Sequence, residues 1–306
     1  MQPSQPRALA RILPAINTSD GAGVRLRRSL GSGEGTRLDP FLMLDEFSSV
    51  NPGDYIAGFP SHPHRGFETV TYILDGHMRH EDHLGNQGDL KSGGVQWMTA
   101  GRGIIHSEMP QQEKGRMRGF QLWINLPAKE KMKPAGYRDI PPEEIPVHTL
   151  PEGGQVKVIA GHLQTGDVTL AGAINGLTTE PLYLDVALPA GATFSQRMTR
   201  GHNAMAYLFE GNVRFAGSDM LVATHSAAIL TDGDFVEFVA GDEGARFLLL
   251  SGRPLGEPVV QYGPFVMNTV AEIEQAMRDY QTGRLTEASG NRSWAVGKAR
   301  LGRDAA

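Results

Sequence analysis

The sequence contains no cysteine among its 306 residues. This absence excludes disulfide frameworks, thiolate zinc sites and thiol nucleophiles, so any metal has to be held by histidine and carboxylate side chains. From Met1 onward there is also no apolar run long enough for a signal segment or a membrane span. We therefore expect a cytoplasmic protein that does not enter a membrane.

Basic charge is scarce as well. The formal net charge is −5, and the one local basic run, Lys129, Lys131 and Lys133, lies among prolines. A solvated linker accounts for such a run better than a nucleic-acid patch does. Because the sequence shows no basic stripe, recognition helix or zinc finger, we expect no direct binding of nucleic acid.

Glycine and proline, by contrast, are abundant. The chain has 38 glycines and 19 prolines, and they separate short runs of β-branched and aromatic residues. This spacing is typical of many strands joined by tight turns, and it predicts an all-β fold. The clearest expected strands are residues 67–74, 95–99 and 120–126, and Asp75-Gly76 after the first of them predicts a hairpin.

The length of the chain suits two domains rather than one. Prolines and charged residues cluster between Pro127 and Gly154, which predicts an exposed connection. We therefore expect a first barrel in residues 1–130, a linker in 131–154, and a second barrel with a C-terminal helix in 155–306.

Two patterns in the second half of the chain support this division. Residues 207–211 repeat the residue types of residues 72–76 in the same order, which indicates an internal duplication. Thr269 and Glu272 predict the capping box of a helix that ends near Gly283. Apolar residues follow the cap at helical spacing: Val270, Ile273, Met277 and Tyr280.

Four side chains that can bind a metal stand in two pairs, His62 with His64 and His106 with Glu108. Residues two apart on an extended chain point to the same face, so each pair can direct both side chains into one barrel. Imidazole and carboxylate donors suit divalent iron, manganese, nickel, copper and zinc. Four ligands leave positions open on an octahedral ion, which favours a catalytic site over a structural one.

Each of these histidines, taken singly, has the alternative of being a surface or hydrogen-bonded residue. The pairing within an all-β chain is what favours a metal site. Glu68 is an additional candidate because it lies an even number of residues from His64. Three further histidines fall in the polar segment after Gly76, where we expect a solvated loop: His77, His80 and His83.

The duplication allows the second half to be compared with the proposed site. Aligning Gly211 with Gly76 puts Arg197 opposite His62 and Thr199 opposite His64. Aligning residues 240–241 with 100–101 puts Arg246 opposite His106 and Leu248 opposite Glu108. None of these four residues replaces the ligand that it faces, so we expect the second barrel to hold no metal. His202 has no partner ligands in this alignment, and a structural or surface role is expected for it.

Two long segments resemble the signature motifs of pirins: FPSHPHRGFETVTYILDG in residues 59–76 and GGVQWMTAGRGIIHSEMP in residues 93–110. Two segments outside the candidate site are also similar to pirin sequences, LDPFLMLDEF in residues 38–47 and EPVVQYGPFVMNT in residues 257–269. The resemblance therefore spans most of the chain.

This resemblance implies two cupin barrels, jelly-roll-like, in tandem. It implies a single metal in the first barrel, held at the positions of His62, His64, His106 and Glu108, with Glu68 near the metal but not bound to it. Fe(II) is the metal that the family favours, and Mn, Ni, Cu, Zn or Co are alternatives that the donors accept.

The resemblance implies two functional classes. One is a quercetin 2,3-dioxygenase, which opens the heterocycle of flavonols with O2, and here Glu108 is the expected acceptor of the flavonol proton because it is the one anionic ligand. The other is a metal-binding, redox-sensitive regulatory protein that acts through protein partners. A scaffold that the metal merely stabilises is a third alternative. We expect a monomer, since the two barrels can cover each other's sheet edges.

The flavonol would need an apolar pocket. Candidate walls are Phe47, Phe59, Trp97 and Met98, although aromatic and methionine side chains in a barrel are also typical of a plain core.

Overall fold

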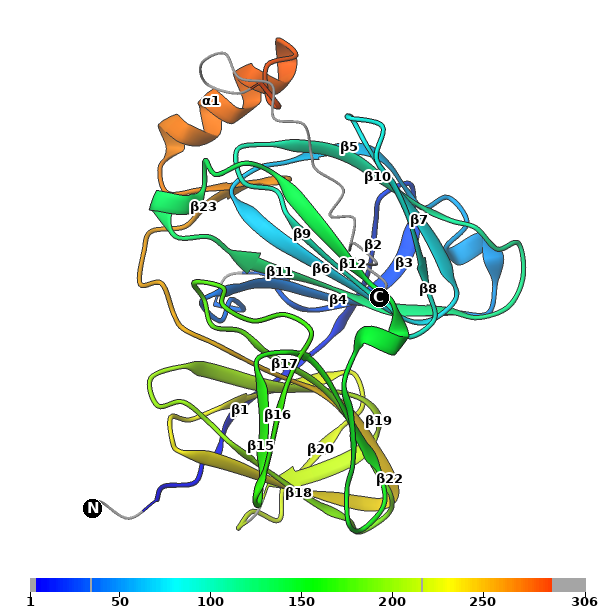
Figure 1. Cartoon of the computed structure of the whole chain (residues 1–306), viewed down its shortest axis with the longest axis vertical. Coiled ribbons are helices and arrows are strands. Elements are labelled where there is room, and N and C mark those ends of the chain that lie inside the picture. Colours follow the sequence, from blue (N-terminus) through cyan, green and yellow to red (C-terminus); the bar gives the residue numbers. More distant parts are fainter. Residues whose placement is uncertain (1–3, 34, 216, 288–306) are drawn as a thin grey trace, which may run out of the picture.

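The computed structural model describes residues 4–33, 35–215 and 217–287. Two β-barrels lie end to end along the long axis of the molecule, and helix α1 (Val270–Gln281) sits at the far end of the first barrel (Figure 1). The predicted fold class, two cupin barrels with a C-terminal helix, is confirmed. Within the described ranges, no helix has the length and apolar character needed to cross a membrane.

The first barrel is built from two antiparallel sheets. The larger sheet has the strand order β12-β9-β6-β11-β4-β3-β2, and the smaller has β5-β10-β7-β8. The strands of the larger sheet are β2 (Ile16–Asp20), β3 (Val24–Leu30), β4 (Phe41–Ser49), β6 (Phe67–Asp75), β9 (Val95–Thr99), β11 (Met117–Asn125) and β12 (Gly136–Ile140). Those of the smaller sheet are β5 (Phe59–His64), β7 (His77–Asp82), β8 (Gln87–Lys91) and β10 (Ile104–Pro110).

The second barrel is one nine-stranded sheet that curls around its own apolar core. Its main path is β1-β21-β19-β22-β17-β14-β13, with β18 paired to β22 and β20 paired to β19. Its strands are β1 (Leu9–Pro14), β13 (Val147–Thr149), β14 (Gln155–Ala160), β17 (Leu182–Leu188), β18 (Thr193–Arg197), β19 (Asn203–Phe215), β20 (Leu221–Ala223), β21 (Ser226–Leu230) and β22 (Phe235–Gly252).

Short elements connect and cover the barrels. Two small hairpins stand apart from the main sheets, one of β15 (His162–Thr165) with β16 (Val168–Ala171), the other of β23 (Val260–Tyr262) with β24 (Phe265–Met267). The 3₁₀ turns are η1 (Pro52–Asp54), η2 (Ala128–Glu130) and η3 (Pro142–Glu144).

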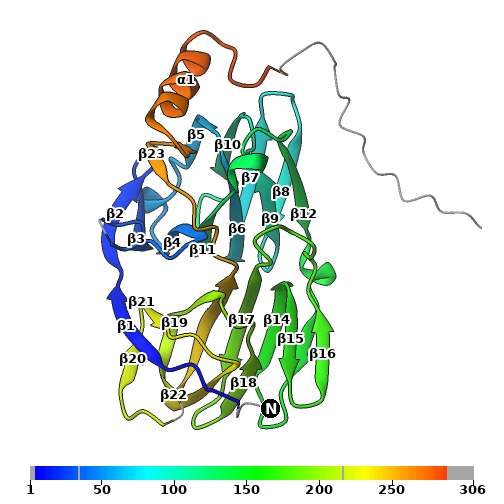
Figure 2. The ribbon, with the colours of Figure 1, turned by 90° about the vertical axis from the view of Figure 1, so that its left-hand side faces the viewer.

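The two ends of the chain cross between the barrels. Strand β1, near the N-terminus, pairs with β21 of the second barrel, whereas β24 and α1 pack on the first (Figure 2). Strand pairing therefore crosses both predicted boundaries, at 130 and 155. Within the predicted linker 131–154, β12 pairs with β9 of the first barrel and β13 with β14 of the second.

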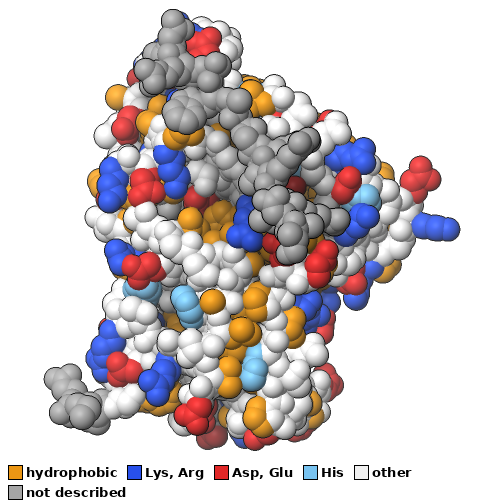
Figure 3. Space-filling model, viewed as in Figure 1, with side chains coloured by type: hydrophobic (Ala, Val, Ile, Leu, Met, Phe, Trp, Pro, Cys, Tyr) orange, Lys and Arg blue, Asp and Glu red, His pale blue; other side chains and the backbone are white. Residues whose placement is uncertain are grey.

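A buried lysine connects β24, in the C-terminal segment, to the first barrel. The ammonium of Lys131 donates to the carbonyl oxygens of Gly66 (2.8 Å) and Val266 (3.0 Å) and to Oδ1 of Asn125 (2.7 Å). Burial lowers its pKa to about 8. The expectation that the basic run is a solvated linker is therefore wrong for Lys131, although Lys129 is exposed. On the face shown in Figure 3, basic and acidic side chains are interspersed.

The expected strands 67–74, 95–99 and 120–126 correspond to β6, β9 and β11. The hairpin predicted at Asp75-Gly76 is wrong, because β7 pairs with β10 and β8 rather than with β6. Gly76, at a φ of +118°, turns the chain from one sheet of the barrel into the other. A turn signal indicates a change of direction, and it does not specify the strand's next partner.

The C-terminal helix begins as predicted. Thr269 accepts from the backbone N–H of Glu272, and the Glu272 side chain accepts from the N–H of Thr269, which completes the capping box. The helix ends at Gln281, two residues before Gly283. Its buried residues are Ile273 and Ala276, while Val270 and Tyr280 of the predicted apolar stripe are largely exposed.

The barrels meet through one continuous apolar core, to which β6, β11, β17, β19 and β22 all contribute. Two rows of paired residues correspond across this contact: Tyr72–Phe120–Glu46 in the first barrel and Tyr207–Leu248–Asp185 in the second. Each tyrosine hydroxyl donates to the carboxyl group of the other row, Tyr72 to Asp185 at 2.6 Å and Tyr207 to Glu46 at 2.8 Å. The predicted duplication is thus expressed as a pseudo-twofold arrangement at the interface.

Candidate metal centre

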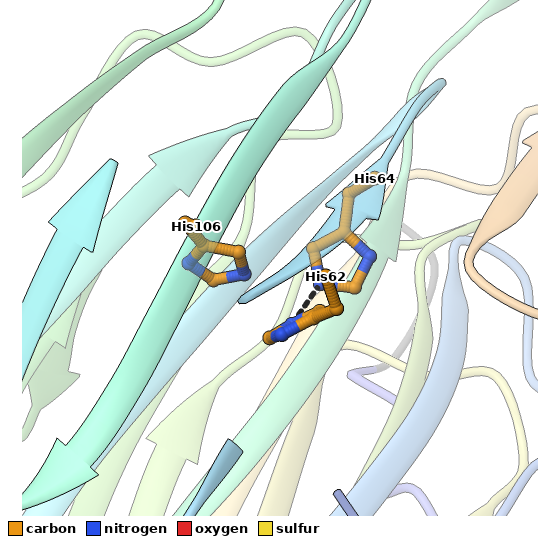
Figure 4. A group of neighbouring side chains, drawn as sticks. All are labelled: His62, His64 and His106. Atoms are coloured by element: carbon orange, nitrogen blue, oxygen red, sulfur yellow. Dashed lines mark hydrogen bonds between the residues drawn. The ribbon is translucent and has the colours of Figure 1, made fainter. Parts of the chain in front are cut away.

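Three of the four predicted ligands converge on the inner face of the smaller sheet of the first barrel. Strands β5 and β10 run antiparallel, with His62 opposite His106 and His64 opposite Ile104. Burial alternates strictly along β10, so His106 and Glu108 both point inward. Figure 4 shows His62 and His64 approaching from β5 and His106 approaching from β10.

The three imidazoles are close enough to share one ion. Each histidine offers a ring nitrogen that lies within 4.8 Å of those of the other two. Nε2 of His62 lies 3.0 Å from Nε2 of His64, and the His62 and His106 ring centroids are 4.4 Å apart. Phe67 and Trp123 pack edge-on against the His64 ring.

Hydrogen bonding sets the tautomer of His62. Its Nδ1 lies 2.7 Å from the carbonyl oxygen of Pro60. A carbonyl oxygen can only accept, so Nδ1 carries the hydrogen and Nε2 presents its lone pair to the group. Nε2 of His106 is buried and has no hydrogen-bond partner in the part of the chain that the structure describes.

The surroundings keep the buried imidazoles neutral. Burial, and then repulsion from His62, lowers the pKa of His64 well below its usual value, although the carbonyl of Pro264 opposes this. Burial, followed by the neighbouring His64, His62 and His80, lowers the pKa of His106 in the same way. A neutral imidazole with a free lone pair is the form that binds a metal. The three histidines therefore fit a divalent first-row metal ion, which they can hold without a thiolate.

Glu108 lies near this group but not within it. Its carboxylate is buried, and its oxygens accept from Thr71 Oγ1 and from Gln121 Nε2, both at 2.9 Å. Gln121 in turn accepts from the indole N–H of Trp123 at 3.3 Å. The complete set of four ligands stays a prediction, while the structure gives Glu108 two donors that hold its carboxylate beside the histidines.

Glu68 faces a different environment. Its carboxylate accepts from Thr99 Oγ1 at 2.6 Å and from the Trp97 indole at 3.3 Å, and Lys133 lies 3.6 Å away. It does not belong to the histidine group. Its buried carboxylate instead ties β6 to β9.

The loop expected for His77, His80 and His83 is only partly found. His77 and His80 lie on strand β7, and His83 is exposed in the turn that follows. His80 is 2% exposed, and its Nδ1 lies 3.2 Å from Nδ1 of His106. The sequence does contain a strand pattern here, because Met78 and His80 alternate with polar residues. The polar composition of the segment led to the prediction of a loop instead.

A cavity of about 930 Å³ reaches the histidine group, where His62 and His64 line it. Its lining includes aromatic and sulfur side chains beside polar ones: Met43, Phe59, His62, His64, Gln121 and Trp123. Pro264 of the C-terminal segment and the glycine-rich turns around Gly21 and Gly33 complete its rim. Of the predicted pocket walls, Phe59 lines this cavity, whereas Phe47, Trp97 and Met98 are buried in core clusters.

The predicted alignment of Arg246 with His106 and of Leu248 with Glu108 is wrong. Leu248 occupies the place of Phe120, so the second half of β22 corresponds to β11. The first half, residues 235–240, pairs with β18 and β19 as β10 pairs with β5 and β7. A one-dimensional alignment could not show that one long strand of the second barrel combines two strands of the first.

Apolar side chains fill the corresponding interior of the second barrel. Glu108 pairs with His80 in the first barrel, and Phe238 pairs with Phe215 at the equivalent place in the second. Both phenylalanines are buried, and Phe194 and Phe247 pack beside Phe238. These side chains offer no ligand atom.

Family comparisons agree with this architecture. Residues 23–124 match the family model described as Pirin, and residues 183–286 match the Pirin C-terminal cupin domain. A pirin-like protein of Caulobacter vibrioides is 51% identical over 91% of this chain and 99% of its own length. The chain belongs to the pirin family. The predicted recognition is thereby confirmed.

Among relatives of this pirin-family chain, a Pseudomonas aeruginosa protein named "putative quercetin 2,3-dioxygenase" is 57% identical over 87% of the chain and 94% of its own length. A solved structure described as quercetin 2,3-dioxygenase from Acinetobacter baumannii superposes with a TM-score of 0.83 at 34% identity, covering 92% of this chain and 99% of that one. Some relatives are therefore named for a quercetin dioxygenase activity, and others are named only as pirin-like proteins.

Proposed function

We propose that this pirin-family protein is a metal-dependent dioxygenase that opens the heterocycle of a flavonol such as quercetin with O2. The observation that carries this proposal is the convergence of three imidazoles, those of His62, His64 and His106, beside a cavity of about 930 Å³ that His62 and His64 line. That volume suits a drug-sized ligand. The activity named for the Pseudomonas and Acinetobacter relatives supports the same choice.

The three histidines would hold the metal, with Glu108 as the proposed fourth ligand. When bound, a divalent metal would supply Lewis-acid chemistry for the reaction of the flavonol with dioxygen. Fe(II) is the metal proposed from the family resemblance, and the nitrogen and oxygen donors also accept Mn, Ni, Cu, Zn or Co. Overall, the reaction takes up one O2 and releases one carbon monoxide as the heterocycle opens.

The remaining lining residues position the substrate. Phe59, Met43 and Trp123 offer apolar surface to a flat aromatic ring system and exclude water from it. Glu108 accepts the proton of the flavonol 3-hydroxyl, and Thr71 and Gln121 hold its carboxylate in place by donating to both oxygens. A deprotonated flavonol is the more electron-rich partner for O2.

The test compares iron-loaded wild type with a His62→Ala, His64→Ala double variant in the presence of quercetin. Oxygen consumption and loss of flavonol absorbance are followed together. We expect turnover in the wild type and none in the double variant, because two of three imidazole ligands are lost. A His162→Ala variant, changed at an exposed histidine of the second barrel, should keep full turnover.

Absence of turnover in iron-loaded wild type would overturn the flavonol assignment and favour the regulatory alternative, in which the metal centre acts through a protein partner. A metal-stabilised scaffold would instead lose thermal stability on chelation, with no activity to lose.

The role of Glu108 is tested by Glu108→Gln, which keeps the shape of the side chain. We expect turnover to fall about 10²- to 10⁴-fold, the usual contribution of a general base. Metal content is measured on the same sample. If the variant retains both its metal and full turnover, Glu108 is not the proton acceptor.

A further inference from the structure

His80 is a buried histidine that the proposed reaction does not use. It lies on β7 directly opposite Glu108 of β10, two positions along the strand from Asp82, which faces His106. Its side chain is 2% exposed, although most of the neighbouring β7 side chains are polar. Burying an imidazole is unfavourable unless its nitrogens find a use, so its position calls for a physical reason.

The contact between His80 and His106 gives a physical reason for burying the His80 ring. The two Nδ1 atoms are 3.2 Å apart, so one must carry a hydrogen and the other must accept it. If His106 binds a metal through Nε2, its Nδ1 carries the hydrogen and donates to His80. Metal binding therefore requires that His80 keep a lone pair on Nδ1 and carry its own hydrogen on Nε2, a buried nitrogen that has no acceptor among the residues that the structure describes. The contact with His106 is thus the one use that the fold gives to the His80 ring nitrogens.

The packing around His80 fixes the ring in this position. The Tyr137 ring lies against it, with centroids 5.1 Å apart and planes inclined at 56°. The His106 ring lies on another side, also at 5.1 Å. On the partner strand, Gly88 faces His80, and the Asp139 side chain crosses over that glycine so closely that a Cβ there would meet its Oδ2 at 2.1 Å. The ring is held between strands that leave it little room to turn.

We propose that His80 is a positioning residue for the metal centre: it accepts the Nδ1 hydrogen of His106 and thereby fixes that ligand's tautomer and ring orientation. This inference rests on the metal site of the proposed function. Metal-ligating histidines usually donate to a carboxylate, a carbonyl oxygen or water, and loss of that acceptor typically weakens metal binding 10- to 100-fold. Because the acceptor here is a neutral imidazole rather than a carboxylate, it places no negative charge beside His106.

The test measures Co²⁺ affinity by competition with a chromophoric chelator, together with the visible Co²⁺ absorption, which reports the ligand geometry. His80→Leu fills similar space without an acceptor, and we expect it to bind Co²⁺ about 10- to 100-fold more weakly than wild type. His80→Asn places its Oδ1 near the position of Nδ1. We expect this variant to recover most of the affinity and the wild-type spectrum.

A matched control is His77→Leu, on the same strand but on its opposite face, where the ring contacts Asp89. It should bind Co²⁺ as wild type does. Thermal unfolding of the metal-free variants separates folding from positioning, because a merely structural His80 would lower stability in both His80 variants without separating their affinities.

Equal Co²⁺ affinity and spectra in wild type and folded His80→Leu would overturn the positioning role while leaving the metal site intact. Failure of wild type itself to bind Co²⁺ would overturn both the role and the metal centre. Loss of flavonol turnover does not enter this measurement, so the dioxygenase proposal can fail without affecting the result.

Discussion

Two of the three imidazoles in the histidine group, those of His64 and His106, are buried, which imposes an electrostatic constraint as well as a chemical opportunity. A proton on either of these two rings would be both desolvated and close to the neighbouring histidines, and the pKa values of His64 and His106 are accordingly lowered. The same effect that prepares the nitrogens for a metal makes the metal-free protein sensitive to acid. Burial likewise lowers the pKa of His80, although Glu108 opposes this.

This gives a prediction for the metal-free protein. In the unfolded chain His64, His80 and His106 take up protons near pH 6.5, while in the folded protein their lowered pKa values keep them neutral at that pH. The unfolded state therefore binds more protons in acid, and stability falls as the pH drops below about 6.5, by up to about 1.4 kcal/mol per pH unit for each such histidine. Denaturant unfolding at pH 7.5, 6.5 and 5.5 measures the slope.

The contribution of one histidine can be isolated by His106→Leu, which should show a shallower dependence on pH than wild type. Replacement of exposed His162 by leucine should leave the slope unchanged. If His106→Leu and wild type lose stability in parallel between pH 6.5 and 5.5, the lowered pKa of His106 does not contribute.

At the scale of elements, the sequence was sufficient to predict which side chains of a single strand share a face. His62 with His64 and His106 with Glu108 fall two apart, and the structure places all three histidines of these pairs in one group. The pattern assigns a face to each residue, but it does not name the partner strand. The alternation of Met78 and His80 with polar residues could have assigned His80 to the inner face of a strand, but its place beside His106 depends on β7 pairing with β10, which no local pattern specifies.

Long-range pairing explains the other differences. Strand β1 pairs with β21, more than 200 residues later, and the turn at Gly76 leads into another sheet rather than a hairpin. Composition and turn residues were sufficient for the fold class and for most strand positions. They could not specify that β1 joins the sheet of the second barrel, or that β24 and α1 pack on the first.

The junction behind His64 offers a test of how closely the C-terminal segment is fitted to the site. Gly66 has a φ of +93°, and a Cβ there would lie 1.9 Å from the carbonyl oxygen of Val266 on β24. Gly66→Ala must therefore strain the backbone and also displace β24. We expect a loss of about 3 kcal/mol or more in the free energy of unfolding, measured by chemical denaturation.

Gly85 provides the matched control. Its φ of +79° is also positive, but a Cβ there meets nothing within 4 Å. Gly85→Ala should lower the free energy of unfolding only through backbone strain, by about 1 to 2 kcal/mol. Similar losses for the two alanine variants would show that β24 yields without cost and is not closely fitted to the first barrel.

At the scale of the whole molecule, duplication has left two halves that are chemically unequal. The histidine group occupies the interior of the first barrel, and phenylalanines fill the corresponding interior of the second. The two halves nevertheless retain equivalent contacts at their interface, where each tyrosine donates to a carboxyl group of the other barrel. The second barrel thus supports the first through a buried surface that includes polar groups.

These contacts predict a graded series among three buried tyrosines of the interface. Tyr207→Phe leaves the fully buried Glu46 with His225 as its remaining side-chain donor, at 2.8 Å. We expect it to lower the free energy of unfolding by about 1.5 to 3 kcal/mol. Tyr72→Phe should cost less, about 1 kcal/mol, because Arg246 still donates to both oxygens of Asp185.

Tyr183→Phe completes the series as its internal control. Tyr183 is equally buried in the same core, but its hydroxyl has no hydrogen-bond partner among the residues that the structure describes. Removing an unsatisfied buried hydroxyl should leave stability unchanged or raise it slightly. Denaturant midpoints of the three variants at one pH measure the order. If Tyr183→Phe were the most destabilising, the reciprocal hydrogen bonds would not be what joins the two barrels, and apolar packing alone would have to account for their association.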